Sequence, residues 1–266
     1  MTRLRIDHAD IGYGDRAVCR DIDLGIPDGA VTVIVGPNAC GKSTVLKALV
    51  RLLKPTAGRV LLDGASISSL PTRDVARAIG LLPQQPVAPD GIRVIDLVAR
   101  GRHPHQRLFS PRTPHDEEAI RTAMELTNTL DLSGRFVDEL SGGQRQRVWM
   151  AVALAQETEI LLLDEPTTYL DVAHQVELLE LCRRLNRDRG LTVVAVLHDL
   201  AQAARYADHL IAMRDGDVVA AGAPRDVVTA DLVRDVFGLD AVVVDDPESG
   251  TPLVVPRWRH GQGSGG

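Results

Sequence analysis

The stretch GPNACGKST spans residues 36–44, between an apolar run, AVTVIV at 30–35, and a helix-like segment, KSTVLKALVRLL at 42–53. It fits the phosphate-loop pattern G-x-x-x-x-G-K-[ST] in the strand-then-helix context that the pattern requires. Its glycines let successive N–H groups point at phosphate oxygens, and the helix N-terminus adds partial positive charge. We expect Lys42 to reach the β- and γ-phosphates of a nucleotide and Ser43 to ligate Mg²⁺, with Thr44 assisting. The alternative is a glycine turn that opens a helix and binds nothing.

Composition narrows the class of protein. The chain has 266 residues, a net charge of −6 and 44% hydrophobic residues, enough for one large or two intimately packed domains. Its acidic balance argues against wide contact with nucleic-acid backbones. The three cysteines lack paired metal spacing, which indicates a reducing compartment. No apolar run approaches the ~20 residues of a membrane span and no secretory signal is visible, so we expect a soluble chain.

The pattern along the chain predicts an α/β fold. Residues 1–35 read as antiparallel strands followed by a buried strand at 31–35, and EILLLDE at 159–165 reads as a strand buried on both faces. Prolines and helical periodicity mark 86–144 as an inserted α-helical subdomain. We therefore expect a mixed or parallel sheet core over 1–85 and 145–225. We expect a C-terminal extension over 226–266, with short helices, a hairpin and a disordered tail, GQGSGG.

Polar residues follow three of the expected strands. Asp164 can hold the hydration shell of Mg²⁺, and Glu165 is placed to activate a water; solvated acids at a strand end are the alternative. Gln84 and His198 also end predicted strands. The carboxyl ends of parallel strands are where α/β sheets bind ligands, so we favour functional roles over those of satisfied polar residues.

Four motifs in fixed order carry a family resemblance: GPNACGKST, LSGGQRQR at 140–147, LLLDEP at 161–166 and VLHD at 196–199. Over about residues 3–222 the chain resembles ATP-binding cassette (ABC) ATPases, a branch of the P-loop NTPases. The resemblance implies ATP and Mg²⁺ as cofactors and the cassette fold, with an N-terminal antiparallel β subdomain and an inserted helical subdomain.

The resemblance also implies roles for individual residues. The catalytic residues would be Glu165, His198 and Lys42, with His198 contacting the γ-phosphate. Tyr13 would be the adenine platform, although a simple strand tyrosine remains the alternative, and Asp171 would communicate across a dimer. Mg²⁺ would be held by Ser43, Gln84 and Asp164. The implied ATP-binding residues are Tyr13, Gly36, Pro37, Asn38, Ala39, Cys40, Gly41, Lys42, Ser43, Thr44 and Gln84.

The second glycine-rich segment would bind the nucleotide of another subunit. In the family this signature loop, here Ser141, Gly142, Gly143 and Gln144, contacts the γ-phosphate held by the partner. The alternative is an N-capped helix, because serine is a good cap residue in its own right. Two departures from the family pattern stand out: Ala39 and Cys40 in the phosphate loop, and Tyr169 before the Leu-Asp pair.

Longer phrases are similar to the ATPases of ferric-siderophore importers: GRHPHQRLF at 101–109, LAQET at 154–158, DVAHQ at 171–175 and DDPESGTPLVVP at 245–256. This implies a homodimer or a paired ATPase subunit on membrane permease subunits, at the cytoplasmic face of a bacterial plasma membrane. A substrate-binding protein would be an indirect partner. Cobalamin or haem import is the alternative, and a DNA-maintenance ATPase is disfavoured because no coiled coil is visible. His103 and His105 lack companion ligands for an iron site.

Overall fold

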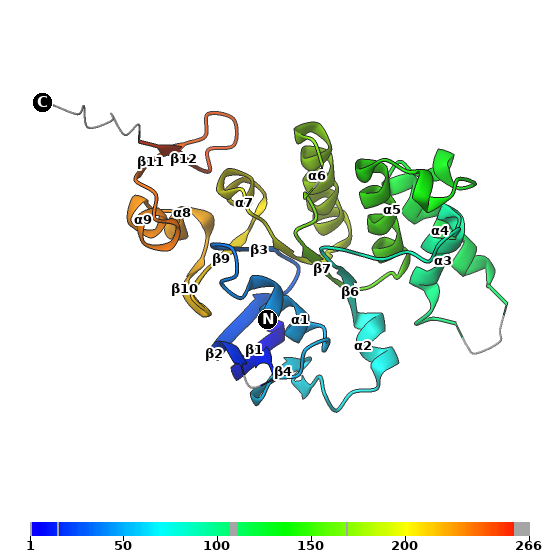
Figure 1. Ribbon diagram of the computed structural model, residues 1–266, viewed down its shortest axis with the longest axis horizontal. Helices are drawn as coiled ribbons and strands as arrows, with labels where there is room; N and C mark the ends of the chain where they lie inside the picture. Colours follow the sequence, from blue (N-terminus) through cyan, green and yellow to red (C-terminus); the bar gives the residue numbers. More distant parts are fainter. Residues whose placement is uncertain (1, 15, 107–110, 169, 258–266) are drawn as a thin grey trace, which may run out of the picture.

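The computed structural model describes residues 2–14, 16–106, 111–168 and 170–257. Two large sheets, a two-stranded hairpin and the helices around them make up this part of the chain (Figure 1). Tyr169 and the tail at 261–266, which we expected to be disordered, lie outside the described residues. Within those residues, no helix is both long and apolar enough to span a bilayer.

The central sheet has six strands in the order β10-β9-β3-β8-β7-β6. They are β3 (Val31–Val35), β6 (Ile79–Leu82), β7 (Ile160–Asp164), β8 (Thr192–Val196), β9 (His209–Arg214) and β10 (Asp217–Gly222). All neighbours pair in parallel except β9 and β10, which are antiparallel. The parallel strands align their carboxyl ends along one edge; Asp164 is the last residue of β7, and the phosphate loop and His198 follow the ends of β3 and β8.

The second sheet is antiparallel, in the order β2-β1-β4-β5. Its strands are β1 (Thr2–Tyr13), β2 (Arg16–Pro27), β4 (Ala57–Leu62) and β5 (Ala65–Ser66), which confirms the antiparallel strands expected at the N-terminus. Helix α1 (Lys42–Leu49) lies between the two sheets. Its Val45 and Leu46 are completely buried in one cluster with Ile6 of β1 and Ile34 of β3. This packing holds the start of α1, and the loop before it, against the central sheet.

The other face of the central sheet is covered by α6 (Val172–Arg189) and α7 (Leu200–Tyr206). Val33 and Leu210 pack on this side, whereas the next residues, Ile34 and Ile211, pack on the α1 side. This alternation is the two-residue period of a strand, and both faces are apolar because both are covered. The chain then adds α8 (Pro224–Val227), α9 (Ala230–Phe237) and a hairpin of β11 (Ala241–Asp245) and β12 (Pro252–Pro256). The short helices and the hairpin agree with the sequence, but the expected boundary between residues 225 and 226 falls inside α8.

Between β6 and β7 the chain forms a separate helical unit, visible as a group at one end of the molecule (Figure 1). It contains α3 (Val94–Ala99), η1 (Arg100–Arg102), α4 (Pro114–Leu126), η2 (Leu130–Leu132), η3 (Val137–Glu139) and α5 (Gly142–Ala155). Its core includes Leu97, Met124 and Val148. The expected boundary at residue 144 is wrong, since it falls inside α5, whose buried side chains continue this core as far as Ala155.

The helix after the phosphate loop is shorter than the sequence predicts. Apolar spacing extended it to residue 53, but α1 ends at Leu49. Arg51 adopts φ 64°, in the left-handed region, which cannot continue a right-handed helix. Leu52, an apolar residue of the segment that the sequence predicts as helix, is 67% exposed. After α1 the chain continues through β4 and β5 to α2 (Thr72–Ala78), which runs directly into β6.

Candidate active site

The phosphate loop requires glycine at two positions. Gly36 has φ 154° and Gly41 has φ 107°, both in the region that favours glycine. A Cβ atom on Gly36 would lie 2.2 Å from the carbonyl oxygen of Met213, and one on Gly41 would lie 2.6 Å from the sulfur of Cys19. The loop therefore follows a path that side chains at these positions would block.

Lys42 is enclosed by the loop that precedes it. Its side chain is buried, and its ammonium donates hydrogen bonds to the carbonyl oxygens of Gly36 (2.9 Å) and Pro37 (2.7 Å). Gly41 caps α1 without a side-chain hydrogen bond, and the first turn of α1 carries no acidic residue. The first N–H groups of the helix and the lysine charge thus face the same loop, an arrangement suited to an anion such as phosphate.

Ser43 and Asp164 bring two oxygen ligands together. The Ser43 hydroxyl donates a 2.7 Å hydrogen bond to Oδ1 of Asp164, at the end of β7. Burial raises the pKa of Asp164, and the hydrogen bond from Ser43 opposes that shift. A hydroxyl beside a buried carboxylate is the kind of hard oxygen set that Mg²⁺ accepts, so these residues fit the predicted ion.

Glu165 is held from two sides. Its Oε1 lies 2.7 Å from Nε2 of His198, and its Oε2 accepts a 2.5 Å hydrogen bond from the amide of Gln84. The hydroxyl of Thr168 adds a longer contact of 3.4 Å. The backbone of Glu165 has φ 52°, a conformation that costs energy for a residue with a side chain and that clusters at functional sites.

These groups face a cavity of about 850 Å³. Its wall includes predicted residues from each motif except the signature loop: Tyr13, Asn38, Ala39, Gly41, Lys42, Ser43, Thr44, Gln84, Glu165 and His198. Tyr13 stands at the end of β1 with about half its surface exposed, and the ammonium of Lys47 lies 5.8 Å from its ring centroid. An exposed aromatic face on the cavity wall is available for stacking, which a purely structural strand tyrosine would not require.

Four predicted residues do not line the cavity: Asp164, Gly36, Pro37 and Cys40. Asp164 is hydrogen-bonded to Ser43, which does line it, and the other three belong to the phosphate loop. The Cys40 thiol is buried, and burial raises its pKa, so it is a poor nucleophile. The carbonyl oxygen of Cys40 accepts a hydrogen bond from the N–H of Gly216, which ties the loop to the turn between β9 and β10.

Sequence reasoning missed five residues of the cavity wall: Arg16, Ala17, Val18, Asp215 and Gly216. They belong to the start of β2 and to the β9–β10 turn, and neither segment has a motif. The dipeptide Asp215-Gly216 predicts a turn, but it does not indicate that the turn lies on the wall of the cavity. A Cβ on Gly216 would lie 2.1 Å from the carbonyl oxygen of Val18, so glycine here lets the turn touch β2.

The signature segment does not line this cavity. Ser141 caps α5: its hydroxyl accepts a 3.3 Å bond from the N–H of Gln144, whose side chain accepts one of 3.1 Å from the N–H of Ser141. The N-capped helix that we considered is therefore real. Ser141 and Gly142 are nevertheless exposed, which leaves the start of α5 accessible to a second molecule.

Asp171 caps another helix. At the start of α6, Oδ1 of Asp171 accepts hydrogen bonds from the backbone N–H of His174 (2.9 Å) and from Nδ1 of the His174 ring (2.7 Å). These bonds hold the pKa of Asp171 below its ordinary value. The expected role in communication between subunits stays a prediction.

Comparisons with known proteins agree with this geometry. A family profile described as ABC transporter matches residues 19–168. The ferric enterobactin transport ATP-binding protein FepC of Escherichia coli (strain K12) is 54% identical over 259 residues, which cover 97% of this chain and 96% of that protein.

Solved structures show the same fold. A metal-chelate type ABC transporter in an inward-facing conformation aligns with a TM-score of 0.82 at 27% identity, covering 97% of this chain and 98% of that one. The dimeric structure of MJ0796, a bacterial ABC transporter cassette, aligns with a TM-score of 0.74 at 27% identity, covering 83% and 98%. With its phosphate loop, its carboxylates at the end of β7 and its helical insert in these positions, the chain belongs to the ABC transporter family.

Proposed function

We propose that this chain is the ATP-hydrolysing subunit of an importer that takes up ferric siderophores. The observation that carries the proposal is the position of Glu165, fixed by Gln84 and His198 on the wall of the same cavity as Lys42. A carboxylate held in this way can orient or deprotonate a water for attack on a phosphate bound to the loop.

The nucleotide has a defined place in this scheme. Tyr13 offers its ring to the adenine, and the loop from Gly36 to Thr44 surrounds the phosphates through its N–H groups and Lys42. His198, whose Nε2 lies 2.7 Å from Oε1 of Glu165, lines the same cavity and would contact the γ-phosphate. Ser43, Gln84 and Asp164 would hold Mg²⁺, which would neutralise charge on the phosphate oxygens.

The signature loop implies a second ATPase subunit. The start of α5, Ser141 to Gln144, in which Ser141 and Gly142 are exposed, closes over the nucleotide of another copy or of a related chain. In our proposal this pair is attached to permease subunits at the cytoplasmic face of the membrane. The substrate-binding protein contacts the permease and not this chain, and nucleic acid is not a partner.

The cargo assignment rests on similarity along the whole chain, 54% over 97% of its length, to an ATPase named for ferric enterobactin transport. The test is uptake of ⁵⁵Fe-labelled siderophores, one catecholate and one hydroxamate, by a strain that lacks the gene. Wild-type chain should restore uptake and Lys42→Ala should not. Lys54→Ala, at an exposed lysine outside the cavity, is the matched control.

Two results would refute the cargo assignment. One is normal uptake of both siderophores in the deletion strain. The other is restoration of labelled cobalamin or haem uptake instead, which would favour the alternative importers.

A further inference from the structure

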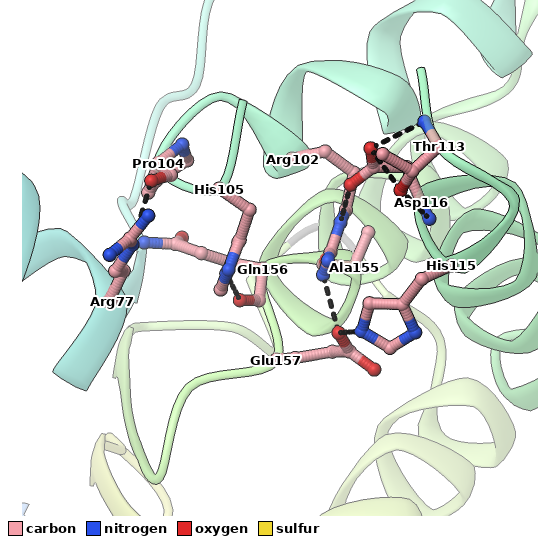
Figure 2. Close-up of polar contacts among 10 residues, drawn as sticks. All are labelled: Arg77, Arg102, Pro104, His105, Thr113, His115, Asp116, Ala155, Gln156 and Glu157. Carbon is pink, nitrogen blue, oxygen red and sulfur yellow. Dashed lines mark hydrogen bonds and ion pairs between the residues drawn. The ribbon is translucent and has the colours of Figure 1, made fainter. Parts of the chain in front are cut away.

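Two arginines of the helical unit are shielded from water, one of them by carboxylates. Arg102 lies in the turn after α3 and is 1% exposed. Its Nε donates a 2.8 Å bond to Oδ1 of Asp116 in α4. One of its terminal nitrogens donates to the carbonyl oxygen of Ala155 (2.7 Å) and to Oε2 of Glu157 (2.6 Å), as Figure 2 shows. The carboxylates of Asp116 and Glu157 therefore compensate the buried charge of Arg102.

The second arginine, Arg147 in α5, has no such partners. It is half-buried, and its Nε is shielded from water yet makes no hydrogen bond. Its guanidinium forms no ion pair with a carboxylate of the described residues. Arginine is rarely buried unless it is paired, and a shielded charge without a partner is costly. Arg147 ends the LSGGQRQR segment, but its side chain takes no part in the helix cap that Ser141 and Gln144 form.

Arg147 lines a cavity of about 280 Å³ between α5, α6 and the turn after α4. The wall includes three buried apolar side chains: Met150 of α5 and Leu178 and Leu181 of α6. None of the described residues that line this cavity also lines the nucleotide cavity. Pockets for drug-sized ligands measure roughly 300–1,000 Å³, so this cavity suits a smaller molecule.

Four other ionisable side chains line the same cavity, and they differ in exposure. Glu177, Glu180 and Arg184 are exposed, so water screens their charges. His174 is half-buried like Arg147, and its Nδ1 lies 2.7 Å from Oδ1 of Asp171, which leaves Nε2 for a ligand. The shielded part of the cavity is therefore positively charged, through Arg147.

We propose that this cavity binds a small oxyanion, a phosphate or a short carboxylate, through Nε and a terminal nitrogen of Arg147. A guanidinium suits both groups because its parallel N–H donors match the spacing of two of their oxygens. The apolar wall lowers the local dielectric constant and so strengthens the contact. The bound anion neutralises the arginine and lies between α5 and α6. This site is separate from the nucleotide cavity and depends neither on the cargo nor on ATP hydrolysis.

The first test is anion binding to the isolated chain. Isothermal titration calorimetry would use inorganic phosphate and, separately, succinate, at constant ionic strength. We expect saturable binding of at least one anion by wild type, weakened about tenfold or more in Arg147→Met. Arg145→Met, at an exposed arginine of the same helix outside the cavity, is the matched control and should bind as wild type. Glu177→Gln should tighten binding about threefold, because it removes a negative charge from the cavity.

Phosphate can also bind the phosphate loop, so the titrations are repeated with Lys42→Ala. Binding that survives in Lys42→Ala and is lost in Arg147→Met belongs to the cavity between α5 and α6. Tighter binding of phosphate would identify free phosphate as the ligand, and tighter binding of succinate a carboxylate metabolite. Three results would overturn the proposal: no binding by wild type, loss of all binding in Lys42→Ala, or equal binding by wild type and Arg147→Met.

Thermal unfolding gives a second readout, which a purely structural role of Arg147 would move the other way. In chloride buffer Arg147→Met should melt at or above the temperature of wild type, because methionine removes an uncompensated charge. Arg102→Met should melt lower, because it strands the Asp116 carboxylate. A saturating anion should raise the melting temperature of wild type and leave that of Arg147→Met unchanged. If Arg147→Met melts as low as Arg102→Met, or does not fold, Arg147 is a structural residue and the cavity is not an anion site.

Discussion

The imidazole Nε2 of His198 lies 2.7 Å from Oε1 of Glu165, across the ends of two neighbouring parallel strands. The pairing of Asp164 with Val196 sets the register of β7 and β8. Glu165 follows the end of β7 by one position, and His198 follows the end of β8 by two. A shift of one residue in either strand would turn the side chains at its end to the opposite face. The contact is therefore a consequence of sheet register, as is the shared cavity.

Glu165→Gln should bind ATP and hydrolyse it very slowly. The amide keeps the size of the side chain but cannot accept a proton, so we expect turnover to fall by about 10²–10⁴-fold. Phosphate release measures turnover, and gel filtration with ATP should show a trapped dimer. Glu159→Gln, at an exposed carboxylate that pairs with Arg3 before β7, is the control. Wild-type turnover by Glu165→Gln would remove the assignment of this residue as base.

Asp164→Asn should stabilise the nucleotide-free protein and inactivate it. Burial raises the pKa of Asp164 above its ordinary 3.8, so the charged form opposes folding; this penalty grows as the pH rises from 3.8 to the folded pKa and is constant above it. At pH 7.5 the melting temperature of Asp164→Asn should therefore lie above that of the wild type. The gain should shrink as the pH is lowered toward 4. Asp188→Asn, on the exposed face of α6, should change little; a lower melting temperature for Asp164→Asn would contradict the argument.

Ala39→Gly should stabilise the phosphate loop. Ala39 has φ 61°, where a Cβ costs roughly 1–2 kcal/mol, and the extra freedom of glycine in the unfolded chain offsets part of the gain. A net rise of about 2 °C in melting temperature should accompany unchanged ATPase activity. Ala173→Gly, in the exposed first turn of α6, should instead be neutral or destabilising. Equal effects at both positions would show that the loop carries no strain.

Ser141→Arg should leave ATP binding intact and abolish both hydrolysis and dimer closure. Loss of the helix cap alone costs about 1 kcal/mol, so it cannot explain complete inactivity. Thr229→Arg is the matched control, because Thr229 caps α9 in the same way, with a bond from the N–H of Leu232. If the two variants retain equal ATPase activity, Ser141 is a helix cap and nothing more.

The Arg102–Asp116 pair should give the protein an acid-sensitive contribution to stability. Burial alone would raise the pKa of Asp116, but hydrogen bonds from Arg102 and Thr113 outweigh it and lower the pKa to about 2. Because the folded pKa is depressed, the contribution is fully present above pH 3.8 and is lost as the pH falls toward 2. Urea unfolding of wild type and Asp116→Asn should therefore differ by a constant amount from pH 7 to about 4.5, and by less at pH 3. A difference that widens on acidification would reverse the sign of this argument.

Local chemistry made much of the site predictable. The residues of the phosphate loop are neighbours in sequence, and their glycines and lysine specify both the turn and its charge. Glu165, Gln84 and His198 were predictable as strand ends, although their mutual contacts required the sheet. The predicted end of α1 is wrong because the apolar spacing continues through Leu52, whereas the helix ends at Leu49 and Arg51 has a left-handed backbone conformation.

Other residues carry no local signal at all. Arg16 and Asp215 reach the cavity only because the second sheet and the β9–β10 turn fold beside α1. Arg102 reads as one more charged residue in a proline-rich stretch, and its burial depends on Asp116 and Glu157 meeting it from two other segments.

By itself the sequence determined the order of strands and helices, the phosphate loop and the identity of the residues at the strand ends. These follow from periodicity, from glycine and from residue type, which act within a few positions along the chain. The tertiary structure alone decided which strand ends meet, what closes the cavity, and that the signature segment does not line the cavity of its own chain. Such contacts depend on sheet order and packing between distant segments, so no window of sequence contains them.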